Sequence, residues 1–115
     1  MATEEDLRAI ALSLPGTEER PGYGKRPSWK VRGKGFVGIW KDEASVTLMV
    51  ESIAEKEALL AEDPDKFFTT DHYGDSPRLL VRLAAVDVDE LRELVTESWR
   101  QHAPPDLLAG DTAGQ

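Results

Sequence analysis

Hydrophobic residues near the N-terminus recur with the spacing of a helix. Four of them fall on one helical stripe: Leu7, Ile10, Ala11 and Leu14. Thr3 precedes this run and Asp6 follows three residues later, which is the pattern of a helix N-cap with an acidic partner. Because Pro15 and Gly16 come directly after the stripe and disfavour helix, the sequence predicts a first helix that ends before Pro15.

Alternating positions predict strands in the next part of the chain. A short strand over residues 18–20 leads into a loop rich in proline and glycine. Apolar and basic residues then alternate strictly over residues 28–32, as in a strand with one buried face. We therefore predict that Trp29 and Val31 point inward and that the cations between them face solvent.

A hairpin turn is predicted after this strand. Glycine reaches positive φ without strain, so Gly33-Lys34-Gly35 predicts a tight turn with Lys34 at its tip. Residues 36–41 are then the returning strand, and residues 46–50 alternate again. The first half of the chain thus predicts an antiparallel meander.

The second half alternates between helix and strand. Ser52 and Glu55 have the spacing of a capping box, and they predict a short helix that ends before Pro64. Residues 67–70 are aromatic and β-branched, which favours a strand. The mostly apolar residues 78–86 predict a central strand that is covered on both sides.

The last helix is predicted to begin after Asp87, whose carboxylate can cap it, and to end before Pro104. Five apolar residues form its buried stripe: Val88, Leu91, Leu94, Val95 and Trp99. The predicted order is helix, several strands, helix, two strands and helix. This order indicates an α+β fold with a mostly antiparallel sheet and helices packed on one face.

Length and composition fit one soluble domain. A chain of 115 residues suits a single core, and we expect that domain to span residues 1–105 and residues 106–115 to form a flexible tail. The chain has no apolar run of about 18 residues to cross a bilayer, and its N-terminus is acidic where a secretory signal is basic. We therefore expect a cytoplasmic protein with no membrane partner. It contains no cysteine, which excludes disulfides and thiolate chemistry.

Charge is unevenly distributed along the chain. The whole sequence has a net charge of −8, from 14 basic and 22 acidic residues. Residues 20–41 contain seven basic residues and no acidic one: Arg20, Lys25, Arg26, Lys30, Arg32, Lys34 and Lys41. Everything outside this window carries seven basic and 22 acidic residues, a net charge of −15. The same window holds four of the eight aromatic residues: Tyr23, Trp29, Phe36 and Trp40.

This window has two interpretations. Basic residues interleaved with aromatic ones are typical of nucleic-acid surfaces, with Tyr23 or Trp29 as stacking groups if they are exposed. On that hypothesis the hairpin binds DNA or another nucleic acid through six cations: Lys25, Arg26, Lys30, Arg32, Lys34 and Lys41. Alternatively the aromatic residues belong to the core, and the basic face is solvated or docks an acidic protein or a second copy of this chain.

No catalytic or cofactor site is predicted. The loop Asp71-His72-Tyr73 brings three acid–base groups together, but no nucleophile in a strained turn accompanies them. Glu90, Glu93 and Glu97 share one helix face, and carboxylates in such a row are usually solvated rather than metal ligands. We therefore expect a protein that is not an enzyme and that holds no cofactor or metal.

Five motifs occur in a characteristic order: LPG after the first helix, SWKVRGKGF, LLAEDPDKFFTTDHYG, VRL and DVDELRELVTESWRQHAP. They extend from about residue 7 to residue 105, and with them the chain resembles the MmcQ/YjbR family. The resemblance implies an α+β fold of the CyaY-like type, to which the name double-wing DNA-binding motif is attached. It implies no set of catalytic residues. The kinship with CyaY raises iron binding by surface acids as a property to examine in this chain.

Overall fold

The computed structural model describes residues 1–108, except for the side chains of Tyr23 and His72. Its helices are α1 (Glu4–Ser13), α2 (Ile53–Glu62) and α3 (Val88–His102). Its strands are β1 (Thr17–Pro21), β2 (Pro27–Val31), β3 (Lys34–Ile39), β4 (Ser45–Met49), β5 (Phe67–Phe68) and β6 (Arg78–Arg82). Short 3-10 turns lie at Tyr23–Lys25, Asp71–Tyr73 and Leu83–Ala85.

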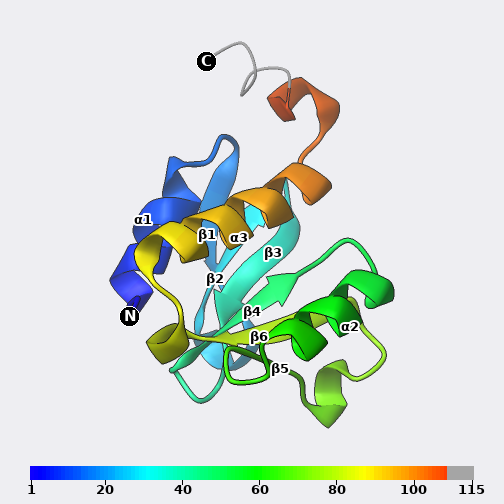
Figure 1. The fold of residues 1–115 in the computed structure, drawn as a ribbon. Helices are drawn as coiled ribbons and strands as arrows, with labels where there is room; N and C mark the ends of the chain where they lie inside the picture. The colour runs from blue at the N-terminus through cyan, green and yellow to red at the C-terminus, as the bar shows by residue number, and fades with distance from the viewer. Residues whose placement is uncertain (109–115) are drawn as a thin grey trace.

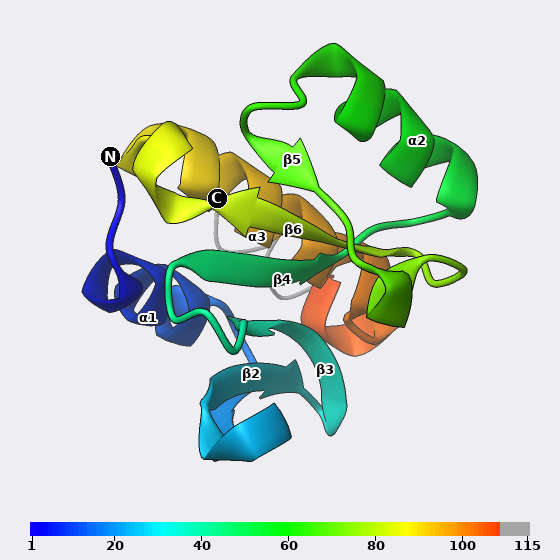
Figure 2. The same cartoon turned by 90° about the horizontal axis from the view of Figure 1, so that it is seen from below.

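The strands form one six-stranded antiparallel sheet in the order β1-β2-β3-β4-β6-β5. Helices α1 and α3 pack on each other over one face of this sheet, and α2 lies beside α3 on the same side (Figure 1). Figure 2 shows the same arrangement from below. The predicted α+β fold, with an antiparallel sheet and helices on one side, is confirmed. Within residues 1–108, no helix has both the length and the apolar character needed to cross a bilayer.

Each helix begins at the cap that the sequence predicts. The Thr3 hydroxyl accepts a hydrogen bond from the Asp6 amide at 3.2 Å, and the Asp6 carboxylate accepts from the Thr3 amide at 2.9 Å. The side chains of Ser52 and Asp87 likewise accept from amides three residues further on, at 3.1 and 2.8 Å. Each such cap stabilises its helix by about 1 kcal/mol.

The core lies between the sheet and the helices. Its largest fully buried side chains, each 0% exposed, are Trp29, Trp99 and Phe36. The Trp99 indole N–H donates to the Pro15 carbonyl at 2.9 Å and so ties α3 to the end of α1. The buried Ser98 hydroxyl donates to the Met49 carbonyl at 2.6 Å, with the Phe36 carbonyl at 3.3 Å. Full burial of one large apolar side chain stabilises the fold by about 1.5–3 kcal/mol.

The hairpin turn between β2 and β3 differs from the prediction. Arg32 and Gly33 are the turn residues, with φ of 51° and 86°, and Val31 pairs with Lys34 across them. Positive φ at both central residues is the geometry of a type I′ turn, whose twist matches that of two antiparallel strands. The predicted turn at Gly33-Lys34-Gly35 is therefore wrong, because Lys34 begins β3 and Arg32 lies at the tip.

Two strands are shorter than predicted. Strand β5 contains only Phe67 and Phe68 of the predicted residues 67–70. Strand β6 ends at Arg82, after which the chain forms a 3-10 turn and leaves the sheet. The central position predicted for β6 is nevertheless correct, because it lies between β4 and β5. Three of its side chains are fully buried: Leu79, Leu80 and Val81.

The packed domain extends beyond the boundary predicted at residue 105. Leu107 and Leu108 pack against the core, and the Asp106 carboxylate accepts from the Arg32 guanidinium at 2.9 Å. Residues 106–108 therefore belong to the domain rather than to a flexible tail. The rest of the predicted tail, residues 109–115, lies outside the described residues.

Candidate functional site

The face of the sheet opposite the helices, which we call the open face, is cationic. Side chains alternate along a strand, so the neighbours of the core residues Trp29 and Leu79 point away from the helices. Strand pairing thereby places four basic residues on the open face: Arg20, Lys30, Arg78 and Arg82. The strands add one carboxylate to it, Glu18, which pairs with Arg20 at 3.2 Å in an exposed contact.

Negative charge gathers instead on the helical side. Helices α1, α2 and α3 together contain ten acidic and four basic residues. The strands contain two acidic and five basic residues. The helices are therefore net acidic and the strands net basic, although the chain as a whole is acidic.

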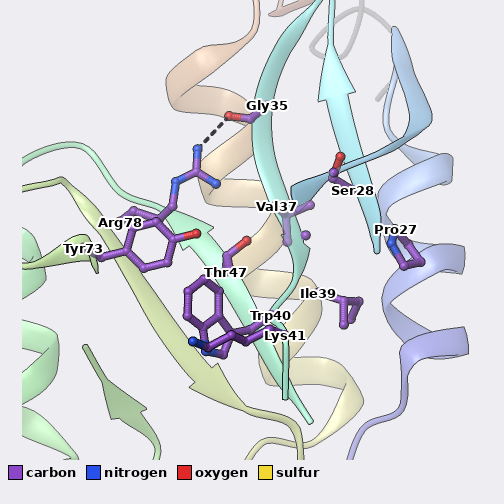
Figure 3. Close-up of a pocket in the computed structure, with 12 residues that line it drawn as sticks. Pro27, Ser28, Gly35, Val37, Ile39, Trp40, Lys41, Thr47, Tyr73 and Arg78 are labelled. Carbon is purple, nitrogen blue, oxygen red and sulfur yellow. Dashed lines mark hydrogen bonds between the residues drawn. The ribbon is translucent and has the colours of Figure 1, made fainter. Parts of the chain in front are cut away.

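A pocket of about 170 Å³ lies in the open face, and we call it the sheet pocket (Figure 3). Ser28, Gly38 and Thr47 stand side by side in register on β2, β3 and β4 and form its floor. Tyr73 and Arg78 lie along one side, and the chain at Trp40 and Lys41 closes one end. The pocket thus combines a low floor with aromatic and basic walls; its lining residues are drawn as sticks in Figure 3.

Gly38 keeps the floor of the sheet pocket low. A β-carbon at this position would lie 3.2 Å from both the Ser28 β-carbon and the Thr47 hydroxyl oxygen, which is closer than ordinary contact. Glycine weakens the interior of a strand and often marks a place where another group approaches the backbone closely. At Gly38 the groups that approach so closely are the Ser28 side chain, the Thr47 hydroxyl and the Pro27 carbonyl, which leave no room for a β-carbon.

Thr47 brings a hydroxyl group into the pocket. The residue is only 6% exposed, and its hydroxyl makes no hydrogen bond to any described residue. The Thr47 hydroxyl is therefore available to a polar group that enters the sheet pocket.

Arg78 supplies a cation whose donors are mostly unused. Its guanidinium donates to the Gly35 carbonyl at 3.4 Å, which is a long hydrogen bond, and lies 6.0 Å from the centre of the Tyr73 ring. No carboxylate within residues 1–108 forms an ion pair with it. Burial lowers the pKa of Arg78, an effect that Tyr73 partly opposes, but a guanidinium stays charged at neutral pH. Arg78 is thus a charged group that can accept an anionic or carbonyl partner.

A buried lysine holds Tyr73 at the pocket. The Lys56 ammonium, on α2, donates to the carbonyl groups of Tyr73 and Ser76, the latter at 2.8 Å. Lys56 is 2% exposed, and burial lowers its pKa. The anchored Tyr73 ring lies 5.1 Å from the Trp40 ring, at an angle of 53°. The aromatic wall of the pocket therefore depends on a contact between α2 and the loop before β6.

The six predicted cations do not form one cluster. Lys25 and Arg26 lie between β1 and β2, at the same end of the hairpin as Lys41, which follows β3. Lys30 lies on the open face, and Lys41 borders the sheet pocket. In the part of the chain that the structure describes, Lys25, Lys30 and Lys41 make no ion pair.

The other two predicted cations lie at the opposite end of the hairpin. Arg32 pairs with Asp106, and Lys34 stands opposite Val31, whose side chain belongs to the core. The Lys34 side chain therefore starts from the helical side of the sheet. Trp29 is fully buried and cannot stack on a base. Of the predicted set, Lys30 thus lies on the open face and Lys41 borders the sheet pocket, at opposite ends of β3.

Sequence reasoning missed Arg78, Arg82 and Thr47 as site residues, and it considered Tyr73 only as an acid–base group. A signal existed for the arginines, because Arg78 and Arg82 are four positions apart in a strand and so share one face. No sequence signal places Tyr73, since its position depends on Lys56, 17 residues away in the chain.

The helical side has a hollow of its own. It lies between α2 and α3, has a volume of about 310 Å³ and is lined mostly by carboxylates. Lys66 stands among them, at 2.5 Å from Glu90 and 3.7 Å from Asp63, and these contacts raise its pKa. Within residues 1–108, no three acidic or histidine side chains converge in a way that would hold a metal ion.

These features define a class of protein: a small α+β domain whose antiparallel sheet is covered by helices on one side and is cationic and hollowed on the other. The sequence model of the YjbR family matches residues 12–101. The chain therefore belongs to the YjbR family, as its motifs implied.

Relatives of this chain carry no assigned activity in their descriptions. The uncharacterized proteins Rv2570 of Mycobacterium tuberculosis strain H37Rv and Mb2600 of Mycobacterium bovis are each 33% identical to it over 121 residues, with 94% of both chains covered. The crystal structure of Deinococcus radiodurans protein DR2400, which has a DUF419 domain, is similar with a TM-score of 0.71. That match has 23% identity and covers 86% of this chain and 77% of the other, so it shows the fold alone.

Proposed function

We propose that this protein binds nucleic acid across the open face of its sheet. The observation that supports the proposal is the separation of charge, with Arg20, Lys30, Arg78 and Arg82 on the open face and the acidic residues concentrated on the helices. Neighbouring strands lie about 4.8 Å apart, so these cations span roughly 19 Å from β1 to β6. Such a row is long enough to meet several successive phosphates.

The net charge of −8 does not oppose this arrangement at short range. The Debye length is about 8 Å at physiological ionic strength, so a polyanion on the open face is largely screened from the acids beyond the sheet. The exposed pair between Arg20 and Glu18 is a weak competitor, because such surface pairs contribute only about 0–1 kcal/mol. The local cations therefore dominate the potential that a bound phosphate experiences.

Binding of short labelled oligonucleotides, measured by fluorescence anisotropy at several salt concentrations, tests the proposal. The variant Arg20→Glu/Lys30→Glu reverses two cations of the open face. The matched control Arg92→Glu/Arg100→Glu reverses two exposed cations of α3 and changes the net charge by the same amount.

Four phosphate contacts to a single strand predict a roughly fiftyfold loss of affinity between 50 and 200 mM salt. The open-face variant should bind weakly and with a salt slope about 1.4 units smaller, because two contacts are removed. The control should bind like the wild type. Absence of binding at 20 mM salt, or an equal loss in the control, would show that the open face does not bind nucleic acid.

The same charge separation favours a second candidate, self-association of the basic open face with the acidic helical side of another copy. Complementary charges of this kind accelerate encounter and weaken with salt. Sedimentation velocity without nucleic acid distinguishes the two functions. Self-association predicts oligomers at low salt that Arg20→Glu/Lys30→Glu abolishes and Arg92→Glu/Arg100→Glu strengthens, whereas nucleic-acid binding predicts monomers in all three proteins.

A further inference from the structure

We propose that the sheet pocket holds one unpaired base of a single-stranded nucleic acid, and that it favours a base with a carbonyl group at its edge, such as thymine, uracil or guanine. This inference rests on the proposed function and deepens it, because it specifies the form of the nucleic acid and the class of base.

The size of the pocket limits its occupant. The sheet pocket has a volume of about 170 Å³. Pockets for drug-sized molecules measure about 300–1,000 Å³. The sheet pocket thus has room for one flat heterocycle but not for a whole nucleotide. The sugar and phosphate would lie outside, on the open face that carries Lys30 and Arg20.

The polar groups of the pocket determine which base edge fits. Arg78 has donors only, and most of them have no acceptor within residues 1–108. The Thr47 hydroxyl beside it makes no hydrogen bond to any described residue and can donate as well. A base that presents acceptors, such as the O6 and N7 atoms of guanine or the O4 atom of thymine, complements these donors. Adenine presents one acceptor at this edge, N7, and an amino group where guanine has O6, so the Arg78 guanidinium meets a donor at that position.

The rings of the pocket suit a flat occupant. Tyr73 is half-buried and lines the pocket, and its ring lies 5.1 Å from that of Trp40. Gly38 adds no side chain to the floor, which the Ser28 side chain and the Thr47 hydroxyl border on either side. Stacking on one aromatic residue changes affinity by roughly tenfold to a hundredfold when that residue is removed.

A duplex cannot use this pocket without distortion. Its bases are paired and stacked, and extruding one of them costs a few kilocalories per mole. An unpaired base in a single strand bears no such cost. The pocket therefore predicts that the protein prefers single strands to duplexes. The cations of the open face alone would predict no such preference.

The test compares four probes of equal length on the full chain at low salt, by fluorescence anisotropy. They are an oligothymidylate, an oligoadenylate, a strand of abasic sites that has phosphates and sugars but no bases, and a duplex. We expect the oligothymidylate to bind at least about tenfold more tightly than each of the other three.

Two variants assign that difference to the pocket. Thr47→Val keeps the shape of the side chain but removes its hydroxyl, and should reduce the preference for oligothymidylate over oligoadenylate. Tyr73→Leu should weaken the binding of both oligothymidylate and oligoadenylate. Neither variant should change affinity for the abasic strand, which also reports that the protein remains folded. Thr96→Val on α3 is the matched control and should behave like the wild type.

The outcomes separate this inference from the proposed function. If the abasic strand or the duplex binds as tightly as oligothymidylate, the open face binds nucleic acid but the pocket does not hold a base. Equal binding of oligothymidylate and oligoadenylate would overturn the preference for a carbonyl edge. If none of the probes binds at 20 mM salt, the proposed function fails and this inference fails with it.

Discussion

Lys56 provides a direct test of how the sheet pocket is assembled. Its ammonium is buried and donates to the carbonyl groups of Tyr73 and Ser76, which fixes the loop before β6 against α2. No ion pair neutralises it within residues 1–108, and Asp75 acts on it only through longer-range attraction. Lys56→Met keeps the length of the side chain and removes every donor. We expect this substitution to release the loop that carries Tyr73.

The loss of stability expected for Lys56→Met is the difference between opposing contributions. A hydrogen bond from a charged group contributes about 1.5–3 kcal/mol to stability, so two would contribute about 3–6 kcal/mol. Burial of the ammonium opposes this, and the lowered pKa of Lys56 reports that cost. A methionine side chain also gains by apolar burial. We therefore expect a net loss of about 1–3 kcal/mol, or roughly 4–12 °C in Tm for a domain of this size.

The dependence on pH gives an independent signature. Because folding lowers the pKa of Lys56 below its ordinary value of 10.5, the unfolded chain binds more protons between the folded and unfolded pKa values. The wild type should then gain stability relative to Lys56→Met as pH rises through that window. Thermal melts followed by circular dichroism at several pH values measure this difference.

A local readout completes the assay. Of the three tryptophans, Trp40 has its ring 5.1 Å from that of Tyr73, so comparing the emission change on substitution of Lys56 with that of a Trp40→Phe background reports the aromatic wall. The exposed Lys34→Met is the control and should stay within about 0.5 kcal/mol of the wild type. A Lys56→Met protein that melts like this control and has unchanged emission would refute the anchoring role.

Three further predictions concern the rest of the fold. Lys66→Met should destabilise the protein near neutral pH, and the difference in Tm should disappear as pH rises above about 10.5 and through the raised pKa of Lys66, where the attraction to Glu90 is lost. Ser98→Ala should lower the unfolding free energy in urea by about 1–3 kcal/mol, because buried carbonyl groups lose their donor. Arg32→Asn should raise the unfolding free energy by about 0.5 kcal/mol, because Asn-Gly suits a type I′ turn. This substitution also removes the ion pair between Arg32 and Asp106, and the variant Asp106→Asn measures that loss separately.

The parts of the fold that the sequence predicted well depend on local signals. The caps at Thr3, Ser52 and Asp87 each involve residues three positions apart. The alternation over residues 28–32 likewise depends only on neighbouring residues of one strand, which point in turn to the core and to solvent. The turn was misassigned because glycines flank Lys34 on both sides and local preference allows either placement. Pairing of Val31 with Lys34, which is a contact between strands, decides between them.

The binding face was harder to predict because proximity in sequence is not proximity in space. Basic residues in one window were expected to act together, yet Arg32 and Lys34 lie at the far end of the hairpin from Lys41. Arg78 joins Lys30 on the open face although it is distant in sequence, since the order of strands brings β6 next to β4. Pairing of strands therefore determines which cations can share a ligand.

The opposite charges of the two sides have a consequence for the kinetics of binding. A polyanion is repelled by the acidic helices and attracted by the open face, so electrostatic steering favours encounters in one orientation. Such steering acts on the association rate and weakens with salt, whereas contacts in a buried pocket act mainly on the dissociation rate. Arg20→Glu/Lys30→Glu should then slow association, and Thr47→Val should accelerate dissociation with little change in association. Stopped-flow measurements that found both variants altered in the same rate constant would mean that the open-face cations and the sheet pocket do not make separate contributions.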